Sequence, residues 1–227
     1  MMEKEKIKAV LFDVDSTLFS YPLMTLILIW KYWPFVPLNA ILMQVRKKLR
    51  AEGKQGDFRM VQANLFSKKL HIPVKWGEGY LNKVVYRGWN QNFQRVPVRK
   101  GVKDFLDLLV KNGIRIGIIS DYPPETKIQQ LGLGDYPWEF LINCEVVGAL
   151  KPNTDAFELA LKKLSIPAGN VMFVGDKYDY DILPPASLGM KTAWLSRKRK
   201  VTGEVKPDII FRNFRELKKK FEEKFMQ

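Results

Sequence analysis

Short apolar runs alternate with helical patterns along most of this chain. We expect β-strands at 7–12, 114–119, 138–143, 170–174, 191–195 and 208–211, where strand-forming residues gather. Helices are expected at 99–112, 154–164 and 213–225. Strands that alternate with helices form a parallel sheet covered on both faces, so the pattern predicts an α/β fold.

The segment from about 19 to 95 breaks this alternation and shows no convincing strand pattern. We expect helices at 38–51, 58–70 and 77–86, with Asp57 as the N-cap residue of the second. A helical block inserted directly after the first strand indicates a cap over a site at the strand ends. The predicted domains are therefore a core of residues 1–18 and 97–227 and a small all-helical cap of residues 19–96.

Composition sets a few further limits. The 227 residues are 46% hydrophobic, which is ample for one domain or a domain with an insertion. The single cysteine, Cys144, excludes an internal disulfide. The N-terminus lacks the apolar run of a signal peptide, so we expect a cytoplasmic protein. A net charge of +14 would attract phosphorylated metabolites, nucleic acid or acidic lipid, and a solvated basic surface explains it equally well.

Two carboxylates, Asp13 and Asp15, stand one residue apart immediately after the first expected strand. Ligands of a parallel sheet bind beyond the carboxyl ends of its strands. Two like charges this close need a cation or a proton to coexist. The pair therefore predicts a charged binding site at this end of the sheet.

Three further signals follow along the chain. Ser120-Asp121 comes after the second expected strand, where a hydroxyl beside free backbone N–H groups can hold a phosphate oxygen. Lys151 precedes a helix start and can neutralise a phosphate and a nearby carboxylate. Asp176 and Asp181 follow the fourth expected strand and offer the oxygen ligands that Mg²⁺ prefers. Each signal alone would fit an ordinary turn, a solvated lysine or a polar loop.

In this order, the four motifs resemble those of the haloacid dehalogenase superfamily of phosphohydrolases. The resemblance covers residues 7–18 and about 97–212, and it does not extend to the sequence of the cap. It implies a Rossmann-like parallel sheet, and the insertion after the first motif resembles the superfamily's helical cap class. It also implies hydrolysis of a small phosphate monoester with Mg²⁺ as cofactor.

The resemblance implies roles for the acidic residues. Asp13 would be the nucleophile that forms an aspartyl-phosphate, and Asp15 would be the general acid and then the general base. Mg²⁺ would be bound by the Asp13 side chain, the Asp15 backbone carbonyl and Asp176, and Asp181 would support this site.

The remaining motif residues would form the phosphate site. Ser120, with Asp121 beside it, and Lys151 would hold the transferring phosphoryl oxygens, and Thr17 would order the first loop. Asp15 separates two reactions within the superfamily, because a carbon–halogen bond gives no alkoxide to protonate. We therefore expect a phosphatase rather than a dehalogenase.

Some features depart from the superfamily's pattern. Lys177 follows Asp176, where a small polar residue is common, and could contact substrate or point to solvent. Pro184-Pro185 interrupts a segment where a helix usually runs. The only histidine, His71, lies in the predicted cap and is expected to be structural.

Several alternatives stay open at this stage. Residues 16–45 carry a single charge, Lys31, and precede a basic run at 46–50, so they could form an interfacial anchor as well as the core of the cap. The same chemistry could serve a phosphatase acting at membranes or on nucleic-acid ends, or a phosphotransferase or mutase acting on a sugar phosphate. A binding module that kept the fold without catalysis is a fourth hypothesis, and oligomeric state cannot be read from the chain.

Overall fold

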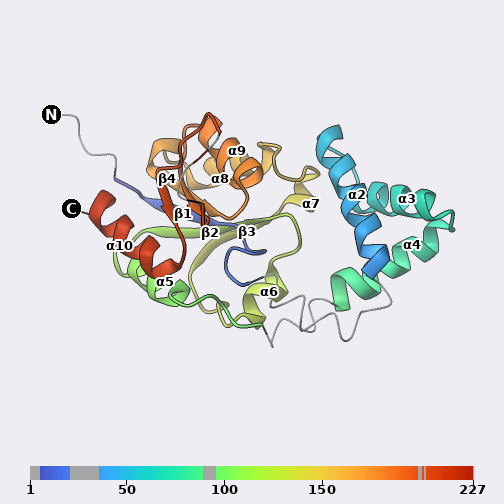
Figure 1. Cartoon of the computed structure of the whole chain (residues 1–227), viewed down its shortest axis with the longest axis horizontal. Coiled ribbons are helices and arrows are strands. Elements are labelled where there is room, and N and C mark those ends of the chain that lie inside the picture. Colours follow the sequence, from blue (N-terminus) through green and yellow to red (C-terminus); the bar gives the residue numbers. More distant parts are fainter. Residues whose placement is uncertain (1–5, 21–35, 89–95, 199–200, 202, 227) are drawn as a thin grey trace.

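A six-stranded parallel sheet forms the centre of the molecule (Figure 1). The computed structural model describes residues 6–20, 36–88, 96–198, 201 and 203–226. The strands are β1 (Ala9–Phe12), β2 (Arg115–Ser120), β3 (Trp138–Asn143), β4 (Val171–Gly175), β5 (Lys191–Leu195) and β6 (Ile209–Phe211). Their order is β3-β2-β1-β4-β5-β6, and every neighbouring pair is parallel. The predicted α/β fold is confirmed.

Helices cover both faces of this sheet. The core helices are α5 (Val102–Lys111), α6 (Glu125–Gln130), α7 (Cys144–Val147), α8 (Asp155–Leu164), α9 (Leu183–Ser187) and α10 (Phe214–Phe225). Short turns of other helix types are η4 (Ala168–Asn170) and η5 (Tyr178–Ile182). The helices α6 and α7 were not expected, because six and four residues are too few to show a helical period.

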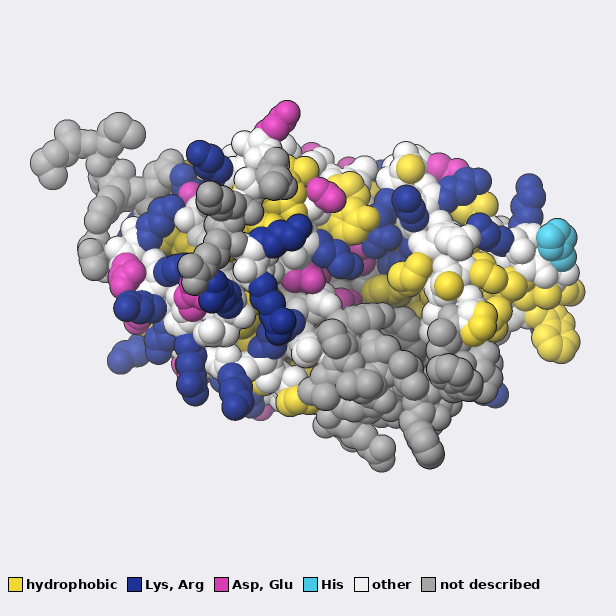
Figure 2. All heavy atoms as spheres, viewed as in Figure 1, with side chains coloured by type: hydrophobic (Ala, Val, Ile, Leu, Met, Phe, Trp, Pro, Cys, Tyr) yellow, Lys and Arg dark blue, Asp and Glu magenta, His cyan; other side chains and the backbone are white. Residues whose placement is uncertain are grey.

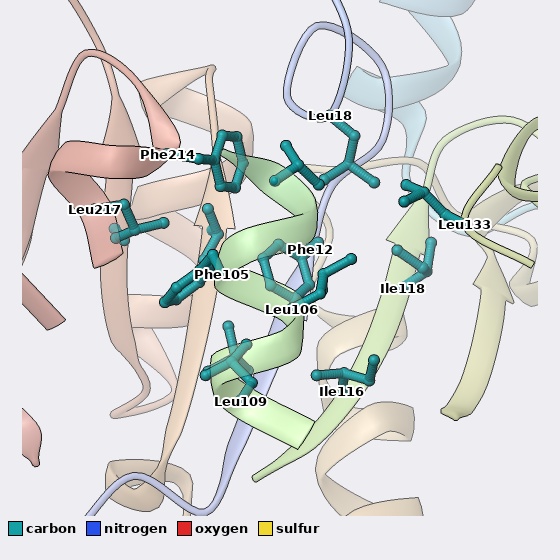
Figure 3. Packing of buried hydrophobic residues seen from close by; sticks show 14 of the residues in the cluster. Phe12, Leu18, Phe105, Leu106, Leu109, Ile116, Ile118, Leu133, Phe214 and Leu217 are labelled. Carbon is teal, nitrogen blue, oxygen red and sulfur yellow. The ribbon is translucent and has the colours of Figure 1, made fainter. Parts of the chain in front are cut away.

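The burial of the central strand β1 explains why its sequence is continuously apolar. All four of its residues are fully buried, and alternate side chains enter different clusters. Phe12 belongs to the same cluster as Phe105 of α5, Ile118 of β2 and Phe214 of α10 (Figure 3), and its ring centre lies 6.1 Å from that of Phe105. Leu11 joins the opposite cluster. A strand buried on both faces therefore reads as an unbroken apolar run.

The helices expected in the cap lie beside the core (Figure 1). They are α2 (Val36–Glu52), α3 (Phe58–Leu70), α4 (Val74–Tyr80) and η2 (Leu81–Gly88), and Asp57 caps α3 by accepting from the Met60 N–H at 3.0 Å. The helix expected at 77–86 is wrong in its bounds: α4 begins after Pro73 and passes into the π-helical η2. The division of the chain into two domains stays a prediction.

Pro184 and Pro185 do not prevent a helix. They stand in the first turn of α9, where the missing backbone N–H has no helical partner to lose. His71 is exposed and ends α3 in the left-handed conformation, with φ of 54°.

Half of the apolar segment 16–45, for which an interfacial anchor was an alternative, lies outside the described residues, at 21–35. Among the helices that are described, none has the length and apolar character needed to span a bilayer. In the basic run at 46–50, Arg46 and Leu49 are buried, so only part of that run faces solvent. Figure 2 shows Lys and Arg side chains spread over core and cap, with Asp and Glu among them.

Candidate active site

The acidic motifs meet at the carboxyl ends of the central strands. Asp13 follows β1, Ser120 ends β2 and Asp176 follows β4. Because β1 lies between β2 and β4, these residues come to one edge of the sheet, where the strand order reverses.

Asp13 is held from two sides. Thr17 donates a hydrogen bond from Oγ1 to Asp13 Oδ2 at 2.7 Å, and Lys151 donates from Nζ to Oδ1 at 2.8 Å. Asp13 is 5% exposed and Lys151 is 3% exposed, so this ion pair is buried. Thr17 therefore contacts the carboxylate, and the structure brings the predicted nucleophile and the predicted cation together.

Asp181 belongs to the same cluster. Lys151 Nζ lies 2.7 Å from its Oδ1, and its Oδ2 accepts from the backbone N–H groups of Asp176 and Lys177 at 3.2 and 2.9 Å. Gly175 makes this approach sterically feasible, because a Cβ there would lie 2.2 Å from the Asp181 Cβ. The loop after β4 is thus wrapped around one buried carboxylate.

Three carboxylates form a group suited to a cation. Asp13, Asp176 and Asp181 each offer an oxygen, and the three atoms lie within 4.8 Å of one another. Asp176 Oδ1 is buried and accepts no hydrogen bond from the described residues. Within the described part of the chain, Lys151 is the ammonium bonded to these three carboxylates, which leaves two negative charges over. The donor set and this unsatisfied oxygen therefore fit a divalent, oxygen-binding cation such as Mg²⁺.

Crowding of the acids changes their proton affinity. Burial, together with the charges of Asp181 and Asp176, raises the pKa of Asp13 to about 8 against the opposing effect of Lys151. Burial and Asp181 raise the pKa of Asp176 to about 6. Burial alone would lower the pKa of Lys151, but the surrounding carboxylates raise it well above its ordinary value. The cluster holds excess negative charge that a proton or a cation can relieve.

Asp15 is held by a different cation. Lys127 of α6 places Nζ 2.7 Å from both Asp15 carboxylate oxygens. The Asp15 side chain is outside the group of three acids that could share an ion, which leaves its backbone carbonyl as the expected ligand. Sequence reasoning missed Lys127, because it lies in a short unrecognised helix and is 112 residues from its partner.

The loop after β2 carries Ser120 and Asp121, the next two residues of the predicted site. Ser120 is fully buried, and its Oγ accepts from the Tyr122 N–H at 3.3 Å. Asp121 lines the cleft with Asp13 and Lys151, and its place at the phosphate site stays a prediction. Its oxygens accept from Arg50 Nη2 at 2.7 Å and from the Lys151 N–H at 3.0 Å. Asp121 thus fixes the positions of the Arg50 side chain and the Lys151 backbone.

A buried arginine joins α2 to this loop. Arg46 is fully buried and donates to Glu145 of α7 at 2.6 Å, to Gln62 of α3 at 2.9 Å and to the Asp121 carbonyl at 2.7 Å. Its guanidinium carbon also lies 3.8 Å from the centre of the Tyr122 ring. The basic run at 46–50 was the only sequence signal for this residue, and it entered the sequence analysis only through the alternative of an interfacial anchor.

A cleft of about 320 Å³ opens over the acids. The clustered acids, Lys151 and Asp121 line it, together with Met43 and Arg50 of α2. Lys177 and Tyr180 also line it, so Lys177 is placed where it can meet a ligand. The cleft therefore combines carboxylates, cations and an apolar side chain in a space suited to a small anionic molecule.

Comparisons with known proteins show which family this chain resembles. Residues 7–189 match the family described as haloacid dehalogenase-like hydrolases. A glyceraldehyde 3-phosphate phosphatase of Pyrococcus abyssi is 31% identical over 132 residues, covering 56% of this chain and 53% of that protein. The chain thus spans about half the length of that relative. A 5-amino-6-(5-phospho-D-ribitylamino)uracil phosphatase of Escherichia coli is 25% identical over 206 residues, 84% of each protein.

A solved structure extends the likeness to the whole fold. The 2-haloacid dehalogenase of Pseudomonas syringae has a TM-score of 0.72 at 20% identity, covering 96% of this chain and 99% of that one. This likeness concerns the fold alone, whereas the named phosphatases support the interpretation of the chain as a phosphatase. The resemblance inferred from the four motifs is confirmed: the chain belongs to the haloacid dehalogenase-like hydrolase family.

Proposed function

We propose that this protein hydrolyses a small phosphate monoester through an aspartyl-phosphate on Asp13. The observation that carries the proposal is the buried Asp13–Lys151–Asp181 cluster, which lines a cleft together with Asp176. A nucleophilic carboxylate must approach an anionic phosphate, and Lys151 lowers the repulsion between them.

Asp13 and Asp15 act in both steps of the proposed reaction, which are formation and hydrolysis of the aspartyl-phosphate. An Asp13 oxygen forms a bond to phosphorus while the bond to the ester oxygen breaks, and Asp15 gives its proton to that leaving oxygen. Water then attacks phosphorus, Asp15 takes the water proton, and the bond between Asp13 and phosphorus breaks. The products are an alcohol and inorganic phosphate, and both aspartates return to their starting states.

The other site residues support these steps. Thr17 fixes the orientation of the Asp13 carboxylate, and Ser120 at the end of β2 and Lys151 beside Asp13 would hold the phosphoryl oxygens. Asp13, Asp176, the Asp15 carbonyl and Asp181 would hold Mg²⁺ or support its ligands. When bound, Mg²⁺ would neutralise charge that develops on the phosphoryl oxygens.

The substrate we propose is a small phosphorylated metabolite. The cleft volume of about 320 Å³ lies at the lower end of the range for small-molecule sites. Two of its relatives are named for small phosphorylated substrates, a triose phosphate and a ribitylaminouracil phosphate. Arg50 and Lys177 add positive charge at the wall of the cleft, which suits an anionic ligand.

A phosphatase screen tests the proposal. We expect Mg²⁺-dependent release of phosphate from 4-nitrophenyl phosphate and from members of a panel of small phosphate esters. Asp13→Asn should lower the rate by at least about 10³-fold, because the amide is no nucleophile. Asp179→Asn is the matched control: Asp179 is exposed in the same loop as Asp181 and should keep the wild-type rate. Folded, Mg²⁺-loaded protein that releases no phosphate from the whole panel would contradict the proposal.

A structural neighbour is named as a 2-haloacid dehalogenase, so release of halide must be distinguished from release of phosphate. Displacement of a halide requires no proton donor, whereas departure of an alkoxide does, and Asp15 supplies one. We therefore expect no chloride release from 2-chloropropionate under conditions in which phosphate esters are hydrolysed.

A further inference from the structure

Lys127 is an interior cation that the reaction steps above do not use. It lies in α6, just after the loop that follows β2, and its side chain is 4% exposed. Lysine side chains are almost never fully buried unless they are paired. Here Nζ lies 2.7 Å from each oxygen of Asp15, and 5.0 Å from the centre of the Tyr122 ring. The pairing explains how the ammonium is tolerated in this position.

The position of Lys127 differs from that of Lys151. Lys151 lines the cleft and bonds to two of the three clustered acids. Among the described residues that line the cleft, Asp15 is present and Lys127 is not. Lys127 therefore approaches Asp15 from the protein side, and the remaining exposure of Asp15, 21% of its side chain, is directed to the cleft.

Two lysines thus divide the acids of the site between them. Lys151 bonds to Asp13 and Asp181, while Lys127 bonds to both carboxylate oxygens of Asp15. This separation has a geometric consequence: Asp15 is kept apart from the acids that could share an ion. A short carboxylate side chain has few rotamers, and a contact to both of its oxygens fixes the plane of the carboxylate.

We propose that Lys127 is a positioning residue that holds the Asp15 carboxyl against the leaving oxygen of the substrate. The proposal rests on the proposed function and adds a residue that acts through Asp15 without touching substrate. Lys127 transfers no proton. An ammonium can donate to one carboxyl oxygen while the other oxygen carries the proton that passes to the leaving group, so the contact is compatible with both states of Asp15.

The nature of the leaving group makes this role measurable. An alkoxide is a poor leaving group and needs the proton from Asp15 as the bond to phosphorus breaks, whereas 4-nitrophenolate leaves without much help. Misplacing Asp15 should therefore slow hydrolysis of an alkyl phosphate more than hydrolysis of an aryl phosphate. The relevant constant is kcat/KM, because it reports the steps up to the first irreversible one, which includes departure of the leaving group.

The experiment compares two esters on the same protein preparation. The kcat/KM value is measured for 4-nitrophenyl phosphate and for the best alkyl phosphate of the panel. In Lys127→Met we expect the alkyl-to-aryl ratio to fall by at least about 10-fold, since misplacement of a catalytic group by 1 Å can cost about 10²-fold. Lys127→Arg restores a donor and should recover most of the ratio. The ratio does not depend on the fraction of folded enzyme, so a partly unfolded variant still gives an answer.

Two controls separate positioning from a structural role. Lys111→Met makes the same chemical change at an exposed position of α5, and it should leave the ratio at the wild-type value. Asp15→Asn should lower the ratio, and adding Lys127→Met to Asp15→Asn should change it no further, because Lys127 acts only through Asp15.

The outcomes distinguish this proposal from the one on which it rests. A ratio that stays within about twofold of wild type in Lys127→Met, with both esters slowed equally, overturns the positioning role and leaves the phosphatase intact. An additional fall of the ratio in the double variant also overturns it. A wild-type protein that hydrolyses neither ester overturns the proposed function, and the role of Lys127 with it.

Discussion

Replacing Arg46 by methionine should be among the most destabilising changes in this protein. Arg46 and Glu145 have side chains that are 0% and 1% exposed, and their charged atoms lie 2.6 Å apart. Methionine fills similar space but leaves the Glu145 carboxylate buried without its principal partner. Removing one member of a buried ion pair typically costs about 3–5 kcal/mol. Gln62 and the Asp121 carbonyl also lose a donor, which favours the upper part of this range.

A double-mutant cycle isolates the pair. Glu145→Met alone leaves a buried guanidinium unpaired and should also cost about 3–5 kcal/mol. The Arg46→Met/Glu145→Met variant has no unpaired charge at this place, so it should be more stable than the sum of the two single losses predicts. We expect a coupling energy of about 2 kcal/mol between the two residues.

Urea unfolding followed by far-ultraviolet circular dichroism measures these differences. Lys48→Met is the matched control, because Lys48 is a 58% exposed cation on the same helix and its pairing with Glu52 is an exposed one. It should change the free energy of unfolding by less than about 0.5 kcal/mol. A loss below about 1 kcal/mol in Arg46→Met, or a cycle with no coupling, would show that Arg46 does not stabilise the contact between α2 and α7.

Three further predictions concern other parts of the structure. The pKa of Asp13 is raised to about 8 and that of Asp176 to about 6, chiefly by burial, so the folded metal-free protein retains protons that the unfolded chain releases. The stability of the metal-free protein should therefore fall as the pH rises from about 4 to 8. The increase in Tm on adding Mg²⁺, measured by a thermal melt at each pH, should be larger at pH 8 than at pH 5.5. An increase in Tm that becomes smaller at the higher pH would contradict this prediction. Gly148→Ala should lower the free energy of unfolding in urea by more than about 1 kcal/mol, because φ is +90° and the new Cβ would lie 2.3 Å from the Gln55 carbonyl oxygen. Gly113→Ala is the control: φ is +67° there and no atom lies within 4 Å of the new Cβ, so this variant has the backbone strain without the clash. Asp57→Ala removes the N-cap bond of α3 and should cost about 1 kcal/mol in the same assay, with a wild-type midpoint as the contrary result.

The fold could be predicted from the sequence because a strand that is buried on both faces of the sheet is apolar at every position. Ala9, Val10, Leu11 and Phe12 are all fully buried, so the central strand appears as an apolar run whichever face is considered. The short helices α6 and α7 have too few residues to show a helical pattern in the sequence. The bounds of α4 also escaped prediction, because Gly77 packs where a Cβ would meet Ser67 Oγ at 2.0 Å, and this contact with α3 is not visible in the local pattern.

The acids of the candidate site were predictable for a similar local reason. Asp13 and Asp176 directly follow recognisable strands, and parallel strands bring their carboxyl ends to one edge. The position of a residue after a strand therefore predicts which other residues it will meet.

The cations could not be found in the same way. Lys127 lies on a helix too short to recognise, and Arg46 lies on a cap helix whose docking no sequence pattern specifies. Their partners are 112 and 99 residues away. Charge counted along the chain assigns such residues to the surface, yet Arg46, Lys127 and Lys151 are at most 3% exposed. Each of these cations is paired with at least one carboxylate, so these groups cancel in the net charge of +14, and the positive excess comes from other lysines and arginines.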